Sequence, residues 1–479
     1  MNKLAKNYLY TGGYQILNIL IMLVTTPYLT RVLGSSCLGI DTYVLSIVQI
    51  CEVMGSLGIT IYGNREIAYV RGNRRQLNRV FWELFFLRMI LGAGVCGIYL
   101  LIALRSRYRV VFLIQMITLV SYYLDISWLY IGLEDVKSVT LCSAFARIGA
   151  AALILTLVRG PEHLYLYVAL SAASQALITV LLLAGCRSRI SLNPFGASGR
   201  NSGIRIRRHL RPVIALFLPQ AASSLYVIFD KTMLGLLASD VSRTSIYDKA
   251  EMIVKAPVVL AAALTTVLMP RIANYHANGM KDDIRNLVRR SLEVMFLLFA
   301  PVSAGMAIVA RIFIPFYLGA GYTDSVRVVW ILSPVILAIA LSNVSGAQFL
   351  IGCNETGYLA ASYLTSAVFN IVGNYFLIPR LDETGASITT LSAEWIVVAI
   401  QFLAMRKILG RIGILRIAYK KILAAALMCA VLIPLGKIGA TLPVMFLQIV
   451  VGAAVYFLAL ALMRDNSLAY GIRMLRGSR

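Results

Sequence analysis

Motifs and residue clusters typical of catalytic and metal sites are absent from this sequence. It contains only three histidines, and its seven cysteines are scattered without a C-x-x-C pair. Because metal sites need closely spaced nitrogen or sulfur ligands, we predict no metal, no cofactor and no disulfide framework. A P-loop, a G-x-G-x-x-G sequence and a nucleophile motif are missing as well. The sequence therefore favours neither an enzyme nor a pump that hydrolyses ATP on this chain.

Acidic residues are also scarce. The chain has 21 Asp and Glu against 45 Lys and Arg, which gives a formal net charge of +24. Such an excess can indicate nucleic-acid binding, but here the basic residues stand in short loops between apolar stretches, where they act as orientation signals. When successive loops are assigned alternately to the two sides of the membrane, most of the basic residues fall on one side. The pattern therefore predicts that both termini are cytoplasmic and that nucleic acid is not a partner.

Long polar segments are the third scarce feature. Hydrophobic residues make up 59% of the chain, and the mean hydropathy is +0.79. About fourteen apolar stretches of roughly 20 residues are long enough to cross a bilayer, and long unbroken apolar runs predict helices rather than a barrel. The fold class is therefore all-α integral membrane. The predicted spans are residues 7–30, 39–62, 81–104, 110–132, 139–158, 163–185, 212–237, 246–270, 291–314, 327–351, 358–379, 385–405, 422–436 and 442–463.

A polar, basic segment at 187–211 separates the first six predicted spans from the next six. The sequence Arg65-Glu66-Ile67-Ala68 after the second span is echoed by Arg271-Ile272-Ala273 after the eighth. An offset of roughly 200 residues over an even number of spans predicts two six-helix lobes related by a parallel pseudo-repeat. The predicted domains are an N-terminal lobe at 1–186, a cytoplasmic linker at 187–211, a C-terminal lobe at 212–408, and two additional transmembrane helices with a short basic tail at 409–479.

Ionisable residues occur inside the predicted spans, where each charge costs about 2.5 to 3.5 kcal/mol if it faces lipid. They must therefore face a wet cavity or a partner. The cations are Arg88, Arg147, Lys231, Lys249 and Lys255, and the acids are Asp41, Glu52, Asp125, Asp230, Asp248, Glu251 and Glu394. Local pairing is the alternative for some of them, since Glu251 and Lys255 are four residues apart on a helix. Together with stripes of uncharged polar residues, they favour a hydrophilic central cavity for an anionic solute such as a sugar-linked phosphate or diphosphate.

Several segments resemble the polysaccharide-transport branch of the MOP flippase superfamily. They are residues 27–34 (PYLTRVLG), 62–68 (YGNREIA), 229–235 (FDKTMLG) and 247–251 (YDKAE). The resemblance covers essentially the whole chain. It implies a flippase that moves undecaprenyl-diphosphate-linked oligosaccharide from the inner to the outer leaflet of the bacterial cytoplasmic membrane. The product would be used for O-antigen, capsule or exopolysaccharide.

The resemblance also implies alternating access of two lobes, driven by H⁺, Na⁺ or the membrane potential, and partnership with a polysaccharide polymerase and a chain-length protein. Candidates for binding diphosphate or acidic sugar are Arg31, Arg88, Arg147, Lys231, Lys249 and Lys255. Candidates for ion or proton coupling are Glu52, Asp125, Asp230 and Glu394. Arg31, Asp230, Lys231 and Lys249 stand in the matching segments, whereas Arg88, Arg147 and Glu394 rest on burial alone.

Other functions stay open at this point. A lipid II flippase of the same superfamily also has fourteen spans. A multidrug antiporter of that superfamily usually has twelve spans and an acidic cavity, which fits the buried cations less well. A membrane polymerase or glycosyltransferase needs sizeable exterior loops with catalytic residues, but here the longest candidate, residues 318–327, has Asp324 as its single acid.

Overall fold

The computed structural model describes residues 3–191, 205–406, 408 and 412–465. Most of the predicted linker at 187–211, and the basic tail beyond residue 465, lie outside this part of the chain. The described residues form two compact units, one of 1–235 with 240–244 and one of 236–239 with 245–479. The predicted lobe boundaries stay a prediction, but α9, which opens the predicted second lobe, belongs almost entirely to the first unit.

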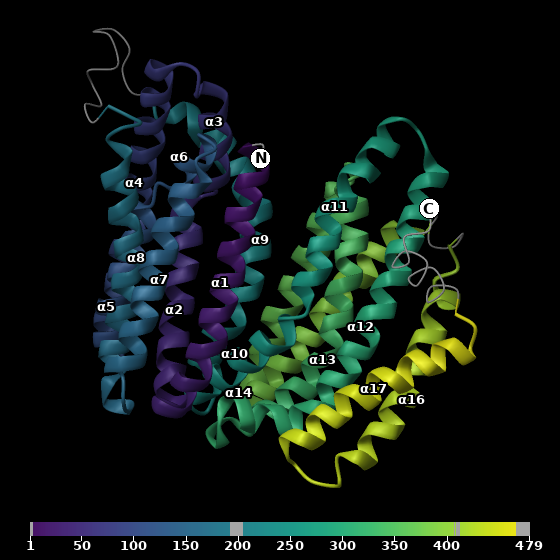
Figure 1. Ribbon diagram of the computed structural model, residues 1–479. Coiled ribbons are helices and arrows are strands. Elements are labelled where there is room, and N and C mark those ends of the chain that lie inside the picture. Colours follow the sequence, from purple (N-terminus) through teal and green to yellow (C-terminus); the bar gives the residue numbers. More distant parts are fainter. Residues whose placement is uncertain (1–2, 192–204, 407, 409–411, 466–479) are drawn as a thin grey trace. The chain divides into compact units, whose positions relative to one another are not determined.

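In the first unit, long helices run alongside one another as a bundle (Figure 1). They are α1 (Lys3–Val32), α2 (Gly34–Ser56), α3 (Ile59–Val70), α4 (Arg74–Arg105), α5 (Arg109–Leu124), α6 (Ser127–Gly132), α7 (Val136–Leu157), the short η1 (Pro161–His163), α8 (Leu164–Cys186) and α9 (Arg207–Leu237).

The second unit contains most of α10 (Ser242–Lys255), then α11 (Val258–Ala277), α12 (Lys281–Leu318), η2 (Ala320–Tyr322), α13 (Ser325–Ser342), η3 (Asn343–Leu350), α14 (Thr356–Ala404), α16 (Ile414–Leu435) and α17 (Leu442–Leu462). The last two helices form a hairpin, drawn in yellow in Figure 1. They correspond to the two additional spans predicted from the sequence.

The helices confirm an all-α membrane protein. Twelve of them, among the described residues, are long and apolar enough to cross a bilayer. One of the twelve, α14, contains two predicted spans that meet at Asp382, whose φ of 49° bends the chain. The predicted seventh span coincides with α9. The predicted total of fourteen is therefore compatible with the fold.

Three predicted spans are each divided into two helices. The second predicted span, 39–62, breaks between α2 and α3, where Leu57 and Gly58 both have positive φ, at 43° and 77°. Glycine adopts that conformation at little cost, so residue 58 provides the break. The fourth breaks at Asp125 between α5 and α6, and the eighth at Pro257 between α10 and α11. Apolar length alone did not reveal these breaks.

Small residues allow the helices of the first unit to pack closely, as is usual in membranes. The Tyr123 ring of α5 lies against Gly55 of α2 and Gly92 of α4, where an added Cβ would collide with it. Its hydroxyl donates to the Cys51 carbonyl over 2.5 Å. This contact ties three helices together beside the predicted charges Glu52 and Arg88.

Glu83 attaches the start of α9 to α4. This carboxylate is fully buried. It accepts the Arg79 Nε–H at 3.1 Å and the Arg205 backbone N–H at 2.8 Å, and it lies 2.6 Å from an Arg208 guanidinium nitrogen. The His209 Nε2 is 2.9 Å away.

At the other end of the linker, Trp82 and Asn78 of the same helix bind the backbone of Ser191. Both described ends of the linker are therefore fixed to α4.

The C-terminal hairpin is held by a buried ion pair. Lys421 of α16 and Asp465 after α17 lie 2.9 Å apart, and both side chains are less than 5% exposed. The hairpin packs on α12, where the Tyr456 hydroxyl donates to the Leu297 carbonyl at 3.0 Å. The predicted additional helices are thus an integral part of the second unit.

Candidate functional site

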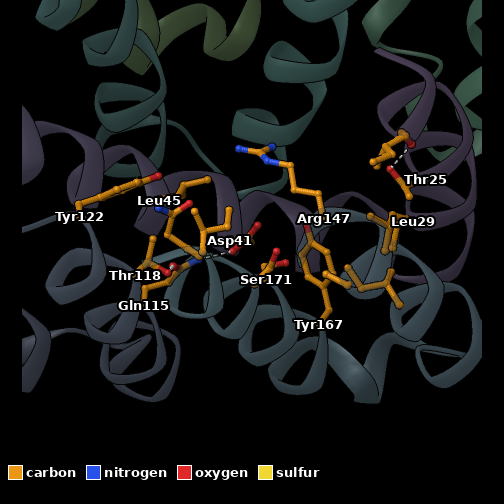
Figure 2. A pocket seen from close by; sticks show the side chains of 17 residues that line it. Thr25, Leu29, Asp41, Leu45, Gln115, Thr118, Tyr122, Arg147, Tyr167 and Ser171 are labelled. Carbon is orange, nitrogen blue, oxygen red and sulfur yellow. Dashed lines mark hydrogen bonds between the residues drawn. The ribbon is translucent and has the colours of Figure 1, made fainter. Parts of the chain in front are cut away.

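A polar cavity of about 270 Å³ lies inside the first unit. Its walls come from α1, α2, α5, α7 and α8 (Figure 2). The polar side chains that line it are Thr25, Asp41, Gln115, Thr118, Tyr122, Arg147, Tyr167, Ser171, Ser174 and Gln175. Polar residues at the middle of apolar helices are costly unless they face water, a partner or a ligand, so this cavity is the candidate site.

One wall of the cavity is a fixed hydrogen-bond network. Asp41 of α2 accepts the Gln115 amide N–H over 3.0 Å, and the Thr118 hydroxyl donates to the Gln115 carbonyl over 2.7 Å. All three side chains are buried. Because the amide donates on one side and accepts on the other, its orientation is determined. The wall therefore presents a positioned carboxylate and polar groups suited to sugar hydroxyls.

Arg147 supplies the positive charge of the cavity. It lies midway along α7, between the Asp41 network on one side and Thr25 and Leu29 on the other (Figure 2). Its side chain is exposed rather than packed. Within the described residues, its guanidinium makes no ion pair and no hydrogen bond. A charge at this depth that is not neutralised by the protein is suited to an anionic ligand.

A cluster of charges lies next to the cavity. Arg88 of α4 is 2% exposed and donates to the carbonyls of Tyr122 and Asp125, at 2.6 Å and 2.9 Å. Both Glu52 of α2 and Asp125 interact electrostatically with it. The structure thus brings together three residues that the sequence placed on separate spans. Asp125 also accepts the Ser127 hydroxyl at 2.6 Å, which fixes the start of α6.

Tyr122 connects this cluster to the cavity. Its side chain lines the cavity, whereas its backbone carbonyl accepts a hydrogen bond from Arg88 of the cluster at 2.6 Å. One tyrosine therefore belongs both to the cluster and to the cavity wall. The first unit places four of the predicted residues, Glu52, Arg88, Asp125 and Arg147, in or beside one site.

The remaining predicted residues do not line this cavity. Arg31 is exposed at the end of α1 and donates to the Pro27 carbonyl at 2.8 Å. In α10, Lys249 pairs with Asp248 at 2.8 Å and Lys255 with Glu251 at 2.7 Å, the latter being the helical pair expected from the sequence. The other three, Asp230 and Lys231 of α9 and the buried Glu394 of α14, also lie elsewhere. Their transport roles stay predictions.

Of the network on the wall opposite Arg147, Gln115 and Thr118 were not selected from the sequence. Gln115, Thr118 and Tyr122 are spaced by three and four residues, which places them on one helical face of the predicted fourth span. That periodicity was available in the sequence. By contrast, Ser171 and Gln175 reach the cavity from α8, a helix without charged residues, so nothing in that span marked it.

Replacing Arg88 with methionine tests whether this buried cation is structural. Arg88 donates to the carbonyl of Tyr122, in the last turn of α5, and to that of Asp125, the residue after the helix. The Tyr122 carbonyl also accepts the Asp125 N–H at 3.3 Å. Loss of Arg88 would remove both charge-assisted hydrogen bonds, so we expect the free energy of unfolding to fall by about 1.5 to 3 kcal/mol. Thermal unfolding in detergent would measure this, with the exposed Arg105→Met in the same helix as control. Unchanged stability together with lost transport would favour the predicted substrate role instead.

Comparison with protein families shows to which family the chain belongs. The family model described as polysaccharide biosynthesis protein matches residues 4–276, more than half of the sequence. The chain belongs to this family, a branch of the MOP flippase superfamily. A second family model, that of lipid II flippase MurJ, matches residues 141–456. The resemblance stated from the sequence segments is therefore confirmed, and the homologues of the chain are transporters and flippases rather than enzymes.

Curated relatives agree in length as well as in sequence. A protein of Escherichia coli (strain K12), provisionally named an O-antigen transporter, is 24% identical over 85% of this chain and 98% of its own. A protein of Shigella dysenteriae with the same provisional name is 20% identical over 81% and 96%.

Solved structures show the same fold at low sequence identity. The inward closed structure of lipid II flippase MurJ superposes with a TM-score of 0.71 and 14% identity, covering 96% of this chain and 99% of that one. The inward-facing structure of a multidrug resistance MATE family transporter gives a TM-score of 0.56 and 15% identity, with 82% and 98% covered. These likenesses establish the fold alone.

Proposed function

We propose that this protein moves undecaprenyl-diphosphate-linked oligosaccharide repeat units across the bacterial cytoplasmic membrane, from the inner to the outer leaflet. The observation that carries the proposal is Arg147, an unneutralised cation that faces a polar cavity at mid-helix depth. Membership of the polysaccharide biosynthesis family and relatives provisionally named O-antigen transporters support the same substrate class.

The cavity chemistry fits the head of such a lipid. A guanidinium can bind two phosphate oxygens at once, so Arg147 would hold the diphosphate. The network of Asp41, Gln115 and Thr118 offers both donors and acceptors for sugar hydroxyls. A volume of about 270 Å³ is near the lower limit for ligand pockets, so it accommodates the charged part and an adjoining sugar rather than the whole oligosaccharide. The prenyl tail would stay in the bilayer.

The proposed cycle is alternating access powered by H⁺, Na⁺ or the membrane potential, with both termini on the cytoplasmic side. Glu52 and Asp125 are the coupling candidates beside the cavity, because protonation or cation binding there would change the charge around Arg88 and Tyr122. Asp230 and Glu394 are the coupling candidates outside it. A change of charge in this cluster would alter the affinity of the cavity for an anion.

The experiment that tests the proposal is leaflet exchange in liposomes that contain a fluorescent undecaprenyl-diphosphate oligosaccharide. We expect exchange that depends on the protein and that accelerates under a proton or sodium gradient. Empty liposomes and liposomes with denatured protein are the controls. If several glycans exchange at the empty-liposome rate while a cationic dye is expelled under the same gradient, the protein is a drug antiporter instead.

Transport of lipid II is the second candidate function. The MurJ family model covers residues 141–456, and the MurJ structure superposes over 96% of the chain. Both substrates share the undecaprenyl diphosphate and differ in the attached glycan. Including lipid II in the same assay separates them, since exchange of lipid II without exchange of any polysaccharide precursor would assign the protein to cell-wall synthesis.

A further inference from the structure

A second and larger cavity lies in the other unit, between α12, α13 and the hairpin of α16 and α17. Its volume is about 700 Å³. Two cations line it, Arg311 of α12 and Lys437 after α16, together with Trp330, Gln448 and apolar residues such as Ile308 and Ile312. This volume is within the usual range for a ligand pocket. The cavity is separate from the proposed transport site.

The cations in this cavity are not neutralised by the protein. Both side chains are exposed, and among the residues that the structure describes neither makes an ion pair or a side-chain hydrogen bond. Arg311 lies about two turns before the end of α12 at Leu318, on an otherwise apolar stretch. Because like charges beside apolar surface repel and are poorly solvated, an anion between them would be stabilising.

Gln448 provides an independent sign of a ligand. Its side chain is 1% exposed and lines the cavity, and its Nε2–H donates to the Leu432 carbonyl at 3.3 Å. Its Oε1 is buried and has no hydrogen-bond partner in the described part of the chain. A buried acceptor left unsatisfied costs about 1 to 3 kcal/mol, so the cavity is suited to a ligand that carries a donor as well as an anion.

The position of the cavity identifies the kind of ligand. Trp330 is 49% exposed near the start of α13, and Lys437 is in the turn that joins α16 to α17. All four polar residues therefore lie near helix ends, at the level where membrane proteins gather Trp, Lys and Arg around lipid headgroups. The exposed Ile433 of α16 also lines the cavity and adds apolar surface beside these polar groups.

We propose that this cavity binds an anionic phospholipid whose headgroup carries a hydroxyl, as phosphatidylglycerol does. The phosphate lies between Arg311 and Lys437, and the headgroup hydroxyl donates to the Gln448 Oε1. One acyl chain lies on the apolar wall formed by α12 and the hairpin. The site belongs to the leaflet opposite the C-terminus, which is the outer leaflet in the proposed orientation. It does not depend on what the protein transports.

Native mass spectrometry of the purified full-length protein, delipidated and then given defined lipids, tests the site. We expect phosphatidylglycerol to bind at least tenfold more weakly to the double variant Arg311→Gln/Lys437→Gln, since each lost charge-assisted contact is worth about 1.5 to 3 kcal/mol. Arg311→Lys/Lys437→Arg should retain binding. Arg327→Gln, which removes an exposed cation of α13 outside the cavity, is the matched control. Equal binding by the parent and the double variant would overturn the proposal.

Two further comparisons test the ligand itself. Phosphatidylmethanol has the same charge but no headgroup hydroxyl, so the parent should prefer phosphatidylglycerol by roughly threefold or more, and Gln448→Leu should lose that preference. Soluble glycerophosphoglycerol should not displace the lipid at equal concentration. Effective displacement would show a site for free phosphates, and a preference unchanged by Gln448→Leu would show that the hydroxyl binds elsewhere. Either result contradicts the assignment.

Discussion

Replacing Arg147 with glutamine should slow leaflet exchange of the lipid-linked oligosaccharide at least tenfold when the substrate is below saturation. Arg147 is the cation of the first-unit cavity, and no group of the described protein neutralises it. Its loss would remove a bidentate contact to diphosphate, and a single charge-assisted hydrogen bond is worth about 1.5 to 3 kcal/mol. Since 1.4 kcal/mol is tenfold in affinity, one lost bond already accounts for the effect.

The matched variants separate charge from geometry. Arg147→Lys retains the charge but not the planar pair of donors, so exchange should fall between that of the parent and that of Arg147→Gln. Arg159→Gln removes a cation just beyond the end of the same helix, where the side chain is exposed and outside the cavity, and it should leave exchange unchanged. A folded Arg147→Gln protein that exchanges at the parental rate would show that the substrate does not use this cavity.

The fold was largely predictable because the bilayer imposes it. Apolar length predicts the candidate spans, and alternating basic loops predict on which side of the membrane each loop lies. Where the prediction differs, local backbone chemistry is the reason. The predicted second span ends early because Leu57 and Gly58 have positive φ, and the predicted eighth span is interrupted at Pro257, between α10 and α11. Hydropathy does not report either feature.

The site was predictable in part. An arginine at mid-span is visible in the sequence, so Arg147 and Arg88 were both candidates, but the sequence could not tell their surroundings apart. In the structure, Arg88 donates to helix-end carbonyls whereas Arg147 faces a cavity. That difference depends on which helices pack together. It determines which of the two cations is available to a ligand.

Glu83 was not among the candidate residues selected from the sequence. It lies near the predicted start of the third span. The basic residues around it are typical of a segment at the membrane interface. Its partners Arg205, Arg208 and His209 are more than 120 residues away in sequence and meet it only through the fold. The His209 Nε2 lies 2.9 Å from the Glu83 carboxylate, and its Nδ1 lies 2.9 Å from the Tyr62 hydroxyl of α3. The result is one carboxylate that joins α3, α4 and the start of α9.

Replacing Glu83 with alanine should lower the free energy of unfolding by about 3 to 5 kcal/mol, the usual effect of removing one partner from a buried ionic network. The change leaves the Arg205 N–H without its acceptor, removes the carboxylate beside the buried His209 ring, and leaves Arg79 and Arg208 with no negative charge between them. Thermal unfolding in detergent followed with a thiol-reactive dye suits the protein, because Cys51, Cys186 and Cys353 are buried.

The chain offers a control with the same local geometry. Arg289 and Glu293 of α12 are also four residues apart and also meet Nε to Oε1 at 3.1 Å, but they are 56% and 24% exposed, whereas Glu83 is 0% exposed. Exposed pairs of this kind contribute about 0.3 to 0.5 kcal/mol, so Glu293→Ala should hardly change the unfolding temperature. If both variants lose equal stability, the pair itself accounts for the effect. A loss confined to Glu83→Ala means that the buried carboxylate acts through its distant partners, and the attachment of α9 to α4 is then its structural role.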